Sequence, residues 1–388
     1  MTRNSFLPFS RPDIGQAEIN EVVRVLSSGW ITSGPKAASF EKAFAEYVGC
    51  PYALALTSCT AGLHLAMEIV DLQPGDEVIT TSLTWPATVN MIHLCGGRPV
   101  FVDVERETFN LDVSQVEKAV TKRTRAILPV HFAGQACELE KLREICKGHG
   151  IVLIEDAAHA IGSEYKGKRI GSGDNMAVFS FHPIKNMTTG EGGMITTHDE
   201  ETYERLRLLR FHGVDKDAWK RYGSAEKEGY DLIIPGWKYN MTDIQAALGL
   251  VQLERLDTMI EKRMTLASLY DDLLMEVEGI TRPRRVLYDI RHSWHLYTIL
   301  VDKEKAGISR DEFMQEMKKR NIGTGIHFLA VHQLSFYRKH YPLPDGSLPE
   351  TVFISERVVS LPLYSGMNES DVHDVVAAIR DIIEKFGK

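Results

Sequence analysis

Short apolar runs alternate with helix-like segments between residues 52 and 197. Seven runs have the length and composition of buried strands: Tyr52–Thr57, Glu77–Thr81, Pro99–Val104, Ala126–His131, Ile151–Glu155, Ala177–Phe181 and Gly193–Thr197. Apolar residues at helical spacing predict helices between them, at Ala61–Val70, Ala87–Cys95, Val113–Val120 and Leu139–His149. Strands that alternate with helices are typical of βαβ units, so we predict an α/β fold with a mainly parallel central sheet.

The rest of the chain predicts a second, smaller unit. Its expected elements are a long helix at Thr242–Lys262, a strand at Leu296–Val301, and helices at Ser309–Arg320 and Ser370–Phe386. We expect a large domain over residues 15–250 and a small α+β C-terminal domain over residues 251–388, joined by residues 1–14. Residues 214–230 are polar and weakly periodic, which predicts a long functional or mobile loop.

Composition and charge disfavour several classes of protein. Lys and Arg total 45 and Asp and Glu total 53, a net charge of −8, which argues against a nucleic-acid binder. No apolar run reaches the ~18 residues of a membrane helix, and residues 1–12 lack the apolar core of an export signal. The five cysteines form no CxxC pair, which favours reduced thiols. We therefore expect a cytoplasmic protein with no membrane or nucleic-acid partner.

Two nucleotide-binding motifs and two metal motifs are incomplete. Residues 171–176 (GSGDNM) begin like a dinucleotide fingerprint but lack its third glycine. Residues 162–169 (GSEYKGKR) have the spacing of a P-loop, but Arg169 replaces the residue that binds magnesium, so we interpret them as a basic β-turn. Two histidine pairs lack the glutamate of a zinc-binding HExxH sequence: His292 with His295, and His327 with His332. We expect no metal site.

The segment 179–193 (FSFHPIKNMTTGEGG) carries the strongest chemical signal. It places Lys185 after an apolar strand and before a glycine-rich turn into the next strand. Open α/β sheets bind ligands at such strand ends. Gly190, Gly192 and Gly193 would allow the backbone to pass close to a bulky group. A lysine held there can lose its proton and form a Schiff base with an aldehyde such as pyridoxal phosphate.

Pyridoxal phosphate has three further requirements, and each has a candidate in the sequence. A carboxylate must hold the proton on the ring nitrogen. Asp156 ends a buried strand, and the alternation of side chains along the strand directs neighbouring Glu155 to the opposite side. A helix N-terminus must bind the phosphate, and residues 57–62 (TSCTAG) follow a strand. An aromatic ring must cover the cofactor, and Trp85 also follows a strand. Each candidate also has a structural alternative when it is taken singly. Asp156 fits a helix N-cap, residues 57–62 fit a plain capping motif, and Trp85 fits a core tryptophan.

Together these groups lie at strand ends of one predicted sheet, and the motifs around them resemble a known family. The chain resembles the DegT/DnrJ/StrS sugar-nucleotide aminotransferases almost from end to end. The matching segments are GWITSGPK (29–36), TSCTAGLHLAM (57–67), GDEVITTSLTW (75–85), IEDAAHAIG (154–162), FSFHPIKNMTTGEGG (179–193) and KYNMTDIQAA (238–247). The resemblance implies the type I (aspartate aminotransferase-like) pyridoxal phosphate fold and pyridoxal 5'-phosphate as cofactor.

The resemblance also implies roles for the residues that react. Lys185 would form the Schiff base with the cofactor and move protons during catalysis. Asp156 would pair with the pyridinium nitrogen, and His159 would lie beside the 3-oxygen of the ring. His327 would face the sugar nucleotide.

Further residues would hold the cofactor in place. Thr60, Ala61 and Ser180 would bind the phosphate, and Trp85 would stack on the ring. Asn240 would reach the phosphate in the neighbouring subunit, so the resemblance implies a homodimer with shared active sites. Cys59 departs slightly from the family, which commonly has alanine or glycine there, but it still fits as a small apolar residue.

The implied reaction moves an amino group from L-glutamate to a 4-keto sugar nucleotide and releases 2-oxoglutarate. The branch resembled most aminates UDP-4-keto-L-arabinose to UDP-4-amino-4-deoxy-L-arabinose, which serves lipid A modification and polymyxin resistance. Its matching segments are FLPFSRP (6–12), SLTWPATVN (82–90), PVHFAG (129–134), GISRDEF (307–313) and NIGTGIHF (321–328).

Four alternatives stay open at this point. The substrate of an aminotransferase could be a UDP-, dTDP- or GDP-4-keto-hexose of surface polysaccharide synthesis. A related sugar 3-dehydratase would have histidine in place of Lys185. A regulatory protein could keep the fold without catalysis, but an intact Lys185 and Asp156 argue against it. A nicotinamide enzyme is disfavoured by the broken glycine fingerprint.

Overall fold

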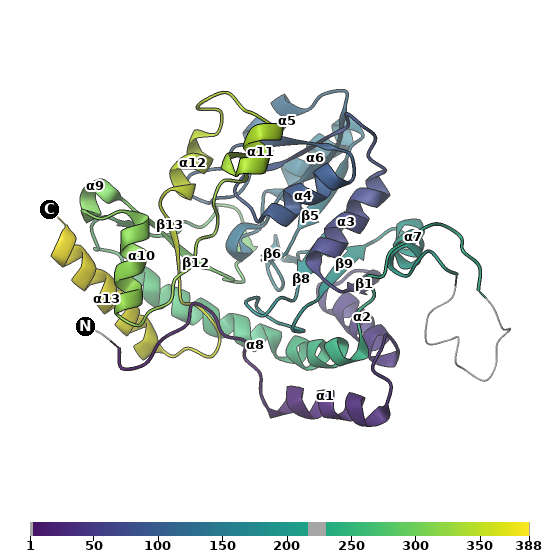
Figure 1. Cartoon of the computed structure of the whole chain (residues 1–388), viewed down its shortest axis with the longest axis horizontal. Helices are drawn as coiled ribbons and strands as arrows, with labels where there is room; N and C mark the ends of the chain where they lie inside the picture. The colour runs from purple at the N-terminus through teal and green to yellow at the C-terminus, as the bar shows by residue number, and fades with distance from the viewer. Residues whose placement is uncertain (1–2, 216–229, 388) are drawn as a thin grey trace.

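The computed structural model describes residues 3–215 and 230–387, and a seven-stranded sheet forms its centre (Figure 1). The strands are β1 Tyr52–Leu56, β2 Glu77–Thr81, β3 Arg98–Val102, β4 Thr124–Leu128, β5 Val152–Asp156, β8 Met176–Ser180 and β9 Gly193–Thr197. All seven predicted strands are confirmed, with ends that differ by at most three residues.

The order of the strands in the sheet is β1-β9-β8-β5-β4-β2-β3. Strand β9 runs antiparallel to both of its neighbours, and all other neighbouring pairs are parallel. The carboxyl ends of β1, β2, β5 and β8 therefore meet at one edge of the sheet, where β9 begins. This arrangement confirms the predicted mainly parallel sheet and the type I fold.

Helices cover both faces of the sheet. The helices of this part are α1 Gln16–Ser28, α2 Pro35–Val48, α3 Cys59–Val70, α4 Pro86–Leu94, α5 Val113–Ala119, α6 Leu139–His149 and α7 Glu200–Arg210. Alternation along β5 shows the layering: Ile154 packs in a core with α3, α4 and α7, whereas Leu153 packs in a core with α2, α6 and the long helix α8 Asp243–Leu273. Runs that are apolar on both faces are typical of such a doubly covered parallel sheet.

The C-terminal part forms a second core around a three-stranded antiparallel sheet, β10-β12-β13. Its strands are β10 Ile280–Thr281, β12 Tyr297–Val301 and β13 Val358–Leu361. Its helices are α8 Asp243–Leu273, α9 Lys303–Ala306, α10 Arg310–Lys319, α11 Ser335–His340, α12 Pro349–Ser355 and α13 Glu369–Phe386. Short 3₁₀ turns lie at Phe132–Gly134 and Val331–Gln333.

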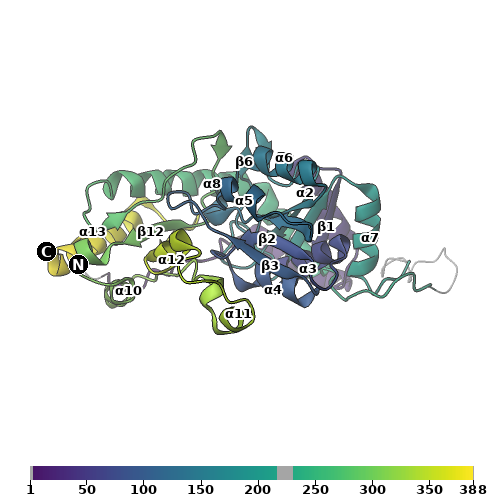
Figure 2. The ribbon, with the colours of Figure 1, turned by 90° about the horizontal axis from the view of Figure 1, so that it is seen from above.

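Helix α8 runs along both cores (Figure 2). Its first half contributes Leu256 to the core of the large sheet, and its second half contributes Tyr270 to the C-terminal core. Leu7 near the N-terminus pairs with Ile322 and joins the same C-terminal core. The proposed division at residue 250 stays a prediction, because α8 is continuous through it.

Three smaller predictions complete the comparison with the sequence. The P-loop-like segment forms the hairpin of β6 Glu164–Tyr165 and β7 Lys168–Arg169, which pairs with β11 Ile290–Arg291, so the predicted turn is confirmed. Most of the predicted loop 214–230 lies outside the described residues. No helix in the described ranges has the length and hydropathy needed to cross a bilayer.

Candidate active site

A cavity of about 360 Å³ opens at the carboxyl edge of the central sheet. Seven of the predicted site residues line it: Thr60, Trp85, Asp156, His159, Ser180, Lys185 and His327. The residues come from the ends of β1, β2, β5 and β8 and from the chain after α10. The parallel strands bring these segments together because their carboxyl ends share one edge. Ala61 and Asn240 do not line the cavity directly.

Lys185 follows β8 in a turn, and its half-buried side chain lines the cavity. Desolvation lowers the pKa of its amine to about 8, although the charges of Cys59 and Asp156 favour the protonated form. Burial therefore outweighs the nearby negative charge. An amine with a pKa near neutrality is a nucleophile and a base under physiological conditions.

This lowered pKa predicts the pH dependence of labelling at Lys185 in apoenzyme. A short pulse of a small amine-reactive reagent modifies only neutral amines, so labelling should be half-maximal at about pH 8 and level off about one pH unit higher. Free N-acetyl-lysine amide in the same mixture has a pKa of about 10.4, so its labelling should keep rising beyond that point. Peptide mass spectrometry measures both rates. A Lys185 profile that follows the free amine would contradict the assignment.

Asp156 is the last residue of β5 and lies below the cavity. Thr88 Oγ1 donates a hydrogen bond of 2.7 Å to its Oδ2, and the Ala158 amide donates one of 3.1 Å to its Oδ1. Burial nevertheless raises the pKa of Asp156. A protonated pyridine nitrogen would offset this desolvation, so the site fits the ring of pyridoxal phosphate. The N-cap alternative is not what forms, because a turn rather than a helix follows β5.

Glu155 points to the other side of the sheet, as its alternation with Asp156 predicts. Its Oε2 lies 2.8 Å from Nε2 of buried His131, and its Oε1 accepts a hydrogen bond of 2.5 Å from Asn175 Nδ2. These contacts lower the pKa of Glu155 in spite of its burial. This carboxylate is therefore satisfied within the protein and does not face the cavity.

His159 has a defined orientation. The Ala133 amide donates a hydrogen bond of 3.2 Å to its Nδ1, so the neutral ring carries its proton on Nε2. Burial and the nearby Lys185 charge keep the pKa of His159 well below its usual value. Phe328 stacks on the ring with centroids 5.6 Å apart. This Nε2–H fits the predicted contact with the 3-oxygen of the cofactor.

The start of α3 forms a phosphate-sized turn after β1. Ser58 caps the helix by accepting a hydrogen bond of 3.1 Å from the Ala61 amide, and the remaining first-turn amides have no acceptor within the helix. A Cβ at Gly193 would lie 2.5 Å from the Ser58 carbonyl carbon, so only glycine lets β9 begin against this turn. Capping and anion binding are thus compatible here, and Thr60 and Ser180 both line the cavity beside the turn.

Trp85 lies at the mouth of the cavity and precedes α4. Its side chain is 65% exposed, so the core-tryptophan alternative is wrong. Phe328 lies next to it, with ring centroids 6.4 Å apart. The exposed indole is compatible with the expected stacking on a cofactor ring, which stays a prediction.

His327 is part of the cavity lining, whereas Asn240 is not. His327 lines the cavity, stacks on Phe9 with centroids 5.3 Å apart, and lies 2.8 Å from Ser360 Oγ through its Nδ1. Burial lowers its pKa to about 3, so the ring is neutral.

Asn240 is buried, and its amide nitrogen donates to Ser33 Oγ. Its Oδ1 has no hydrogen-bond partner among the described residues.

The two histidine pairs do not converge on a shared metal position. His292 stacks on Trp294 at a centroid distance of 4.1 Å, whereas His295 packs against His159 at 4.4 Å. His332 lies 2.7 Å from Ser82 Oγ, away from the Ser360 contact of His327. Each ring has its own surroundings.

Three residues of the site were not predicted from the sequence: Thr88, Phe328 and His295. Thr88 and Phe328 contact Asp156 and His159 from elements distant in the chain. Burial, the Lys185 charge and neighbouring His159 keep the pKa of His295 well below normal. Neither ring nitrogen of His295 has a partner among the described residues. The spacing of Thr84, in the bend before α4, and Thr88, in the first turn of α4, is the one sequence signal for Thr88, and the two hydroxyls lie 2.8 Å apart.

Comparison with known proteins places the chain in a family. The model of the DegT/DnrJ/EryC1/StrS aminotransferase family matches residues 12–380. The spore coat polysaccharide biosynthesis protein SpsC of Bacillus subtilis is 46% identical over 383 residues, which cover 98% of each chain.

Solved structures agree with this assignment. The putative sugar aminotransferase Spr1654 of Streptococcus pneumoniae, in its PMP form, has a TM-score of 0.90 at 34% identity and covers 98% of this chain and 100% of its own. A PLP form of the same protein also matches. Helicobacter pylori PseC, an aminotransferase involved in pseudoaminic acid biosynthesis, has a TM-score of 0.89 at 30% identity and covers 99% of this chain and 100% of its own. The chain therefore belongs to the DegT/DnrJ/EryC1/StrS family and is a pyridoxal-phosphate-dependent sugar aminotransferase.

Proposed function

We propose that this enzyme transfers the amino group of L-glutamate to the C4 carbonyl of a keto sugar nucleotide. The main support is a single arrangement: the desolvated amine of Lys185 shares a cavity with the buried Asp156 carboxylate and the N-terminal turn of α3. These groups fit the reactive aldehyde, the ring nitrogen and the phosphate of pyridoxal phosphate. When bound, this cofactor supplies an electron-withdrawing ring that stores the charge released when a C–H bond breaks.

The proposed role of Lys185 is to hold and move one proton. Its amine takes the proton from the α-carbon of glutamate and returns it to the methylene carbon of the cofactor. The same transfers in reverse order complete the reaction with the keto sugar. The pKa of about 8 suits both directions, because the amine gains and loses a proton at similar cost near neutral pH.

The proposed roles of Asp156 and His159 are electrostatic. Asp156 keeps the proton on the ring nitrogen, and Thr88 and Ala158 fix the direction of its carboxylate. His159 donates from Nε2 to the 3-oxygen, because Ala133 already occupies Nδ1. Both side chains are fixed before the ligand binds, so little reorganisation is needed during the reaction.

The sugar specificity is also a proposal. Residues 6–12, 82–90 and 321–328 resemble the branch that uses UDP-4-keto-L-arabinose, and this substrate is the first candidate. The second candidate is a UDP-, dTDP- or GDP-4-keto-hexose. It is favoured by the similarity to SpsC and PseC, which are named for spore coat polysaccharide and pseudoaminic acid biosynthesis.

A panel of substrates tests the proposed function. Purified holoenzyme receives L-glutamate and one keto sugar nucleotide at a time, and 2-oxoglutarate is measured with a coupled assay. We expect the UDP-4-keto-pentose to give the highest kcat/KM. A preference for a 4-keto-hexose would select the second candidate. Failure to form 2-oxoglutarate with every member of the panel would remove the proposed function.

We further propose a homodimer in which Asn240 completes the partner's site. The buried, unpaired Oδ1 of Asn240 belongs to the segment that pairs with β1, and Asn240 does not line the cavity of its own chain. This position supports a contact across an interface.

Mixed dimers of two variants test whether Lys185 and Asn240 of different subunits serve the same active site. Lys185→Ala and Asn240→Ala homodimers should both be weakly active, but coexpression should restore about a quarter of the wild-type rate. Half of the dimers are mixed, and one of the two shared sites in each mixed dimer is intact. Activity that stays at the level of the parents would show that the two residues do not serve a shared site.

A further inference from the structure

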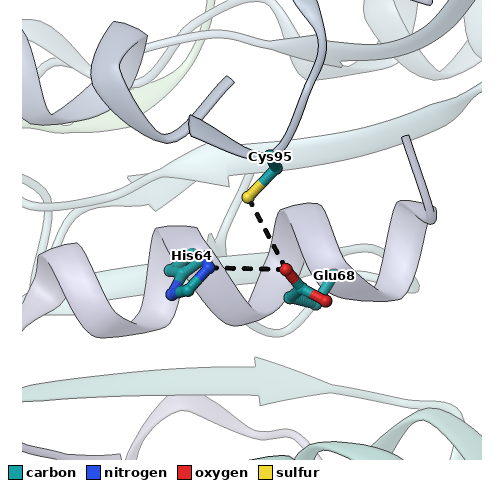
Figure 3. Close-up of side chains that lie close together, drawn as sticks. All are labelled: His64, Glu68 and Cys95. Atoms are coloured by element: carbon teal, nitrogen blue, oxygen red, sulfur yellow. Dashed lines mark hydrogen bonds and ion pairs between the residues drawn. The ribbon is translucent and has the colours of Figure 1, made fainter. Parts of the chain in front are cut away.

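A second group of reactive side chains lies where α3 meets the end of α4, outside the cofactor cavity (Figure 3). His64 and Glu68 are one turn apart on α3, and Cys95 caps the C-terminus of α4. One potential ligand atom from each residue lies within 4.8 Å of the other two. We call these three residues the α3–α4 cluster.

Two of the three ligand–ligand distances in the α3–α4 cluster are close to those of a tetrahedral metal site, and the third, between His64 and Cys95, is within 4.8 Å. His64 Nε2 lies 3.4 Å from Glu68 Oε1, and Cys95 Sγ lies 3.9 Å from the same oxygen. Zinc bonds of ~2.1 Å to nitrogen and oxygen and ~2.3 Å to sulfur require N–O and O–S separations of about 3.4 and 3.6 Å at tetrahedral angles. The first separation already matches, and the second needs a shift of only a few tenths of an ångström.

Tyr239 supports the orientation that a metal ligand needs. Its hydroxyl lies 3.0 Å from His64 Nδ1, and Trp237 packs edge-on against the same imidazole at 4.6 Å. Histidine ligands commonly donate their second N–H to a neighbouring oxygen, which fixes the tautomer. With Nδ1–H directed at Tyr239, the lone pair of Nε2 faces Glu68 and Cys95.

The surroundings of the α3–α4 cluster permit ion entry. The side chains of His64 and Glu68 are 17% and 32% exposed, so the site is neither closed nor fully solvated. Desolvation and the Glu68 carboxylate also give neighbouring Cys95 a raised pKa of about 12. A dipositive ion would counter this effect by stabilising the thiolate.

We propose that His64, Glu68 and Cys95 bind one Zn²⁺ ion, with water as the fourth ligand. A set of one nitrogen, one oxygen and one sulfur donor suits zinc and disfavours Mg²⁺ or Ca²⁺, which prefer oxygen ligands alone. The competing explanation is a hydrogen-bonded trio without metal, in which Glu68 accepts from both His64 and Cys95. Only the zinc proposal requires a stoichiometric ion.

The position of the ion gives it a structural role. It would join α3, whose first turn faces the cavity, to the far end of α4, which begins after Trp85. By fixing His64, the ion would also hold its hydrogen-bond partner Tyr239, which directly precedes Asn240 in the chain. Zinc binding should therefore stabilise the elements around the cavity without contacting the reacting atoms.

The test uses tag-free holoenzyme that has been dialysed against a chelator and then equilibrated with dilute ZnCl₂. Bound zinc is measured by equilibrium dialysis with elemental mass spectrometry, and thermal unfolding is measured with and without zinc. We expect about one ion per chain and a higher Tm with zinc in the wild type. Cys95→Ser and His64→Gln should each bind zinc at least about tenfold more weakly and lose the Tm increase.

Matched variants separate this site from other thiols and imidazoles. Cys146→Ser and His149→Gln change a cysteine and a histidine of α6 and should retain the ion. Glu68→Gln preserves side-chain shape, so it tests the site even if Cys95→Ser does not fold. Wild-type enzyme with much less than one ion per chain, or folded cluster variants that bind as tightly as wild type, would overturn the proposal.

Discussion

A Lys185→Ala variant is expected to lose about 10⁴-fold or more in kcat for transamination, since loss of a positioned acid–base group alone costs up to about that factor. The substitution also removes the amine that bonds to the cofactor. The desolvated position of Lys185 supports both functions, because it is the residue in the cavity whose amine is poised near neutral pH. Formation of 2-oxoglutarate from L-glutamate measures the loss.

Two controls make this result specific. Lys168→Ala changes an exposed lysine of the β6–β7 hairpin and should leave kcat unchanged. Borohydride treatment of the wild type should add the mass of the reduced cofactor to the peptide that contains Lys185. An adduct on another lysine would disprove the assignment, as would a variant that transaminates normally without an added amine.

An Asp156→Asn variant is expected to lose about 10²-fold or more in kcat, because an amide cannot stabilise the proton on the pyridine nitrogen. The geometry around the side chain should survive, since the asparagine oxygen can accept from the Ala158 amide while its NH2 group donates to Thr88 Oγ1. The expected loss is therefore electrostatic. Steady-state kinetics should show the effect mainly in kcat, and the absorption spectrum of the bound cofactor should shift.

Two neighbouring residues serve as comparisons for Asp156. Thr88→Val removes one hydrogen bond to the carboxylate and should cost only about tenfold. Glu155→Gln changes the adjacent carboxyl group on the opposite side of β5, where it contacts His131, so it should lower Tm and leave kcat nearly unchanged. Equal rates for Asp156→Asn and the wild type would show that this carboxylate does not act on the ring.

The C-terminal end of α8 could not be predicted from the sequence pattern. The sequence predicted a helix that ends at Lys262, but α8 continues to Leu273. The additional turns carry Leu266 and Tyr270, which pack in the C-terminal core. Contacts with that core stabilise the extension, and local spacing cannot report them.

Trp85 gives a second example. Its position after β2 was predictable, but the sequence left open whether the side chain was buried. It is 65% exposed and lines the cavity together with Phe328. Segments that are far apart in the chain form this cavity, so no local pattern describes it.

The amino-acid order alone determined the strands of the large sheet and which residues follow them. Lys185, Asp156 and the turn at Ser58 converge because parallel strands put their carboxyl ends at one edge, so naming the strands already places these residues together. Tertiary packing decided the rest: the Thr88 contact with Asp156, the entry of His327 into the cavity, and the approach of Cys95 to α3. These contacts depend on how helices and distant segments pack on the sheet, and short-range periodicity carries no information about that packing.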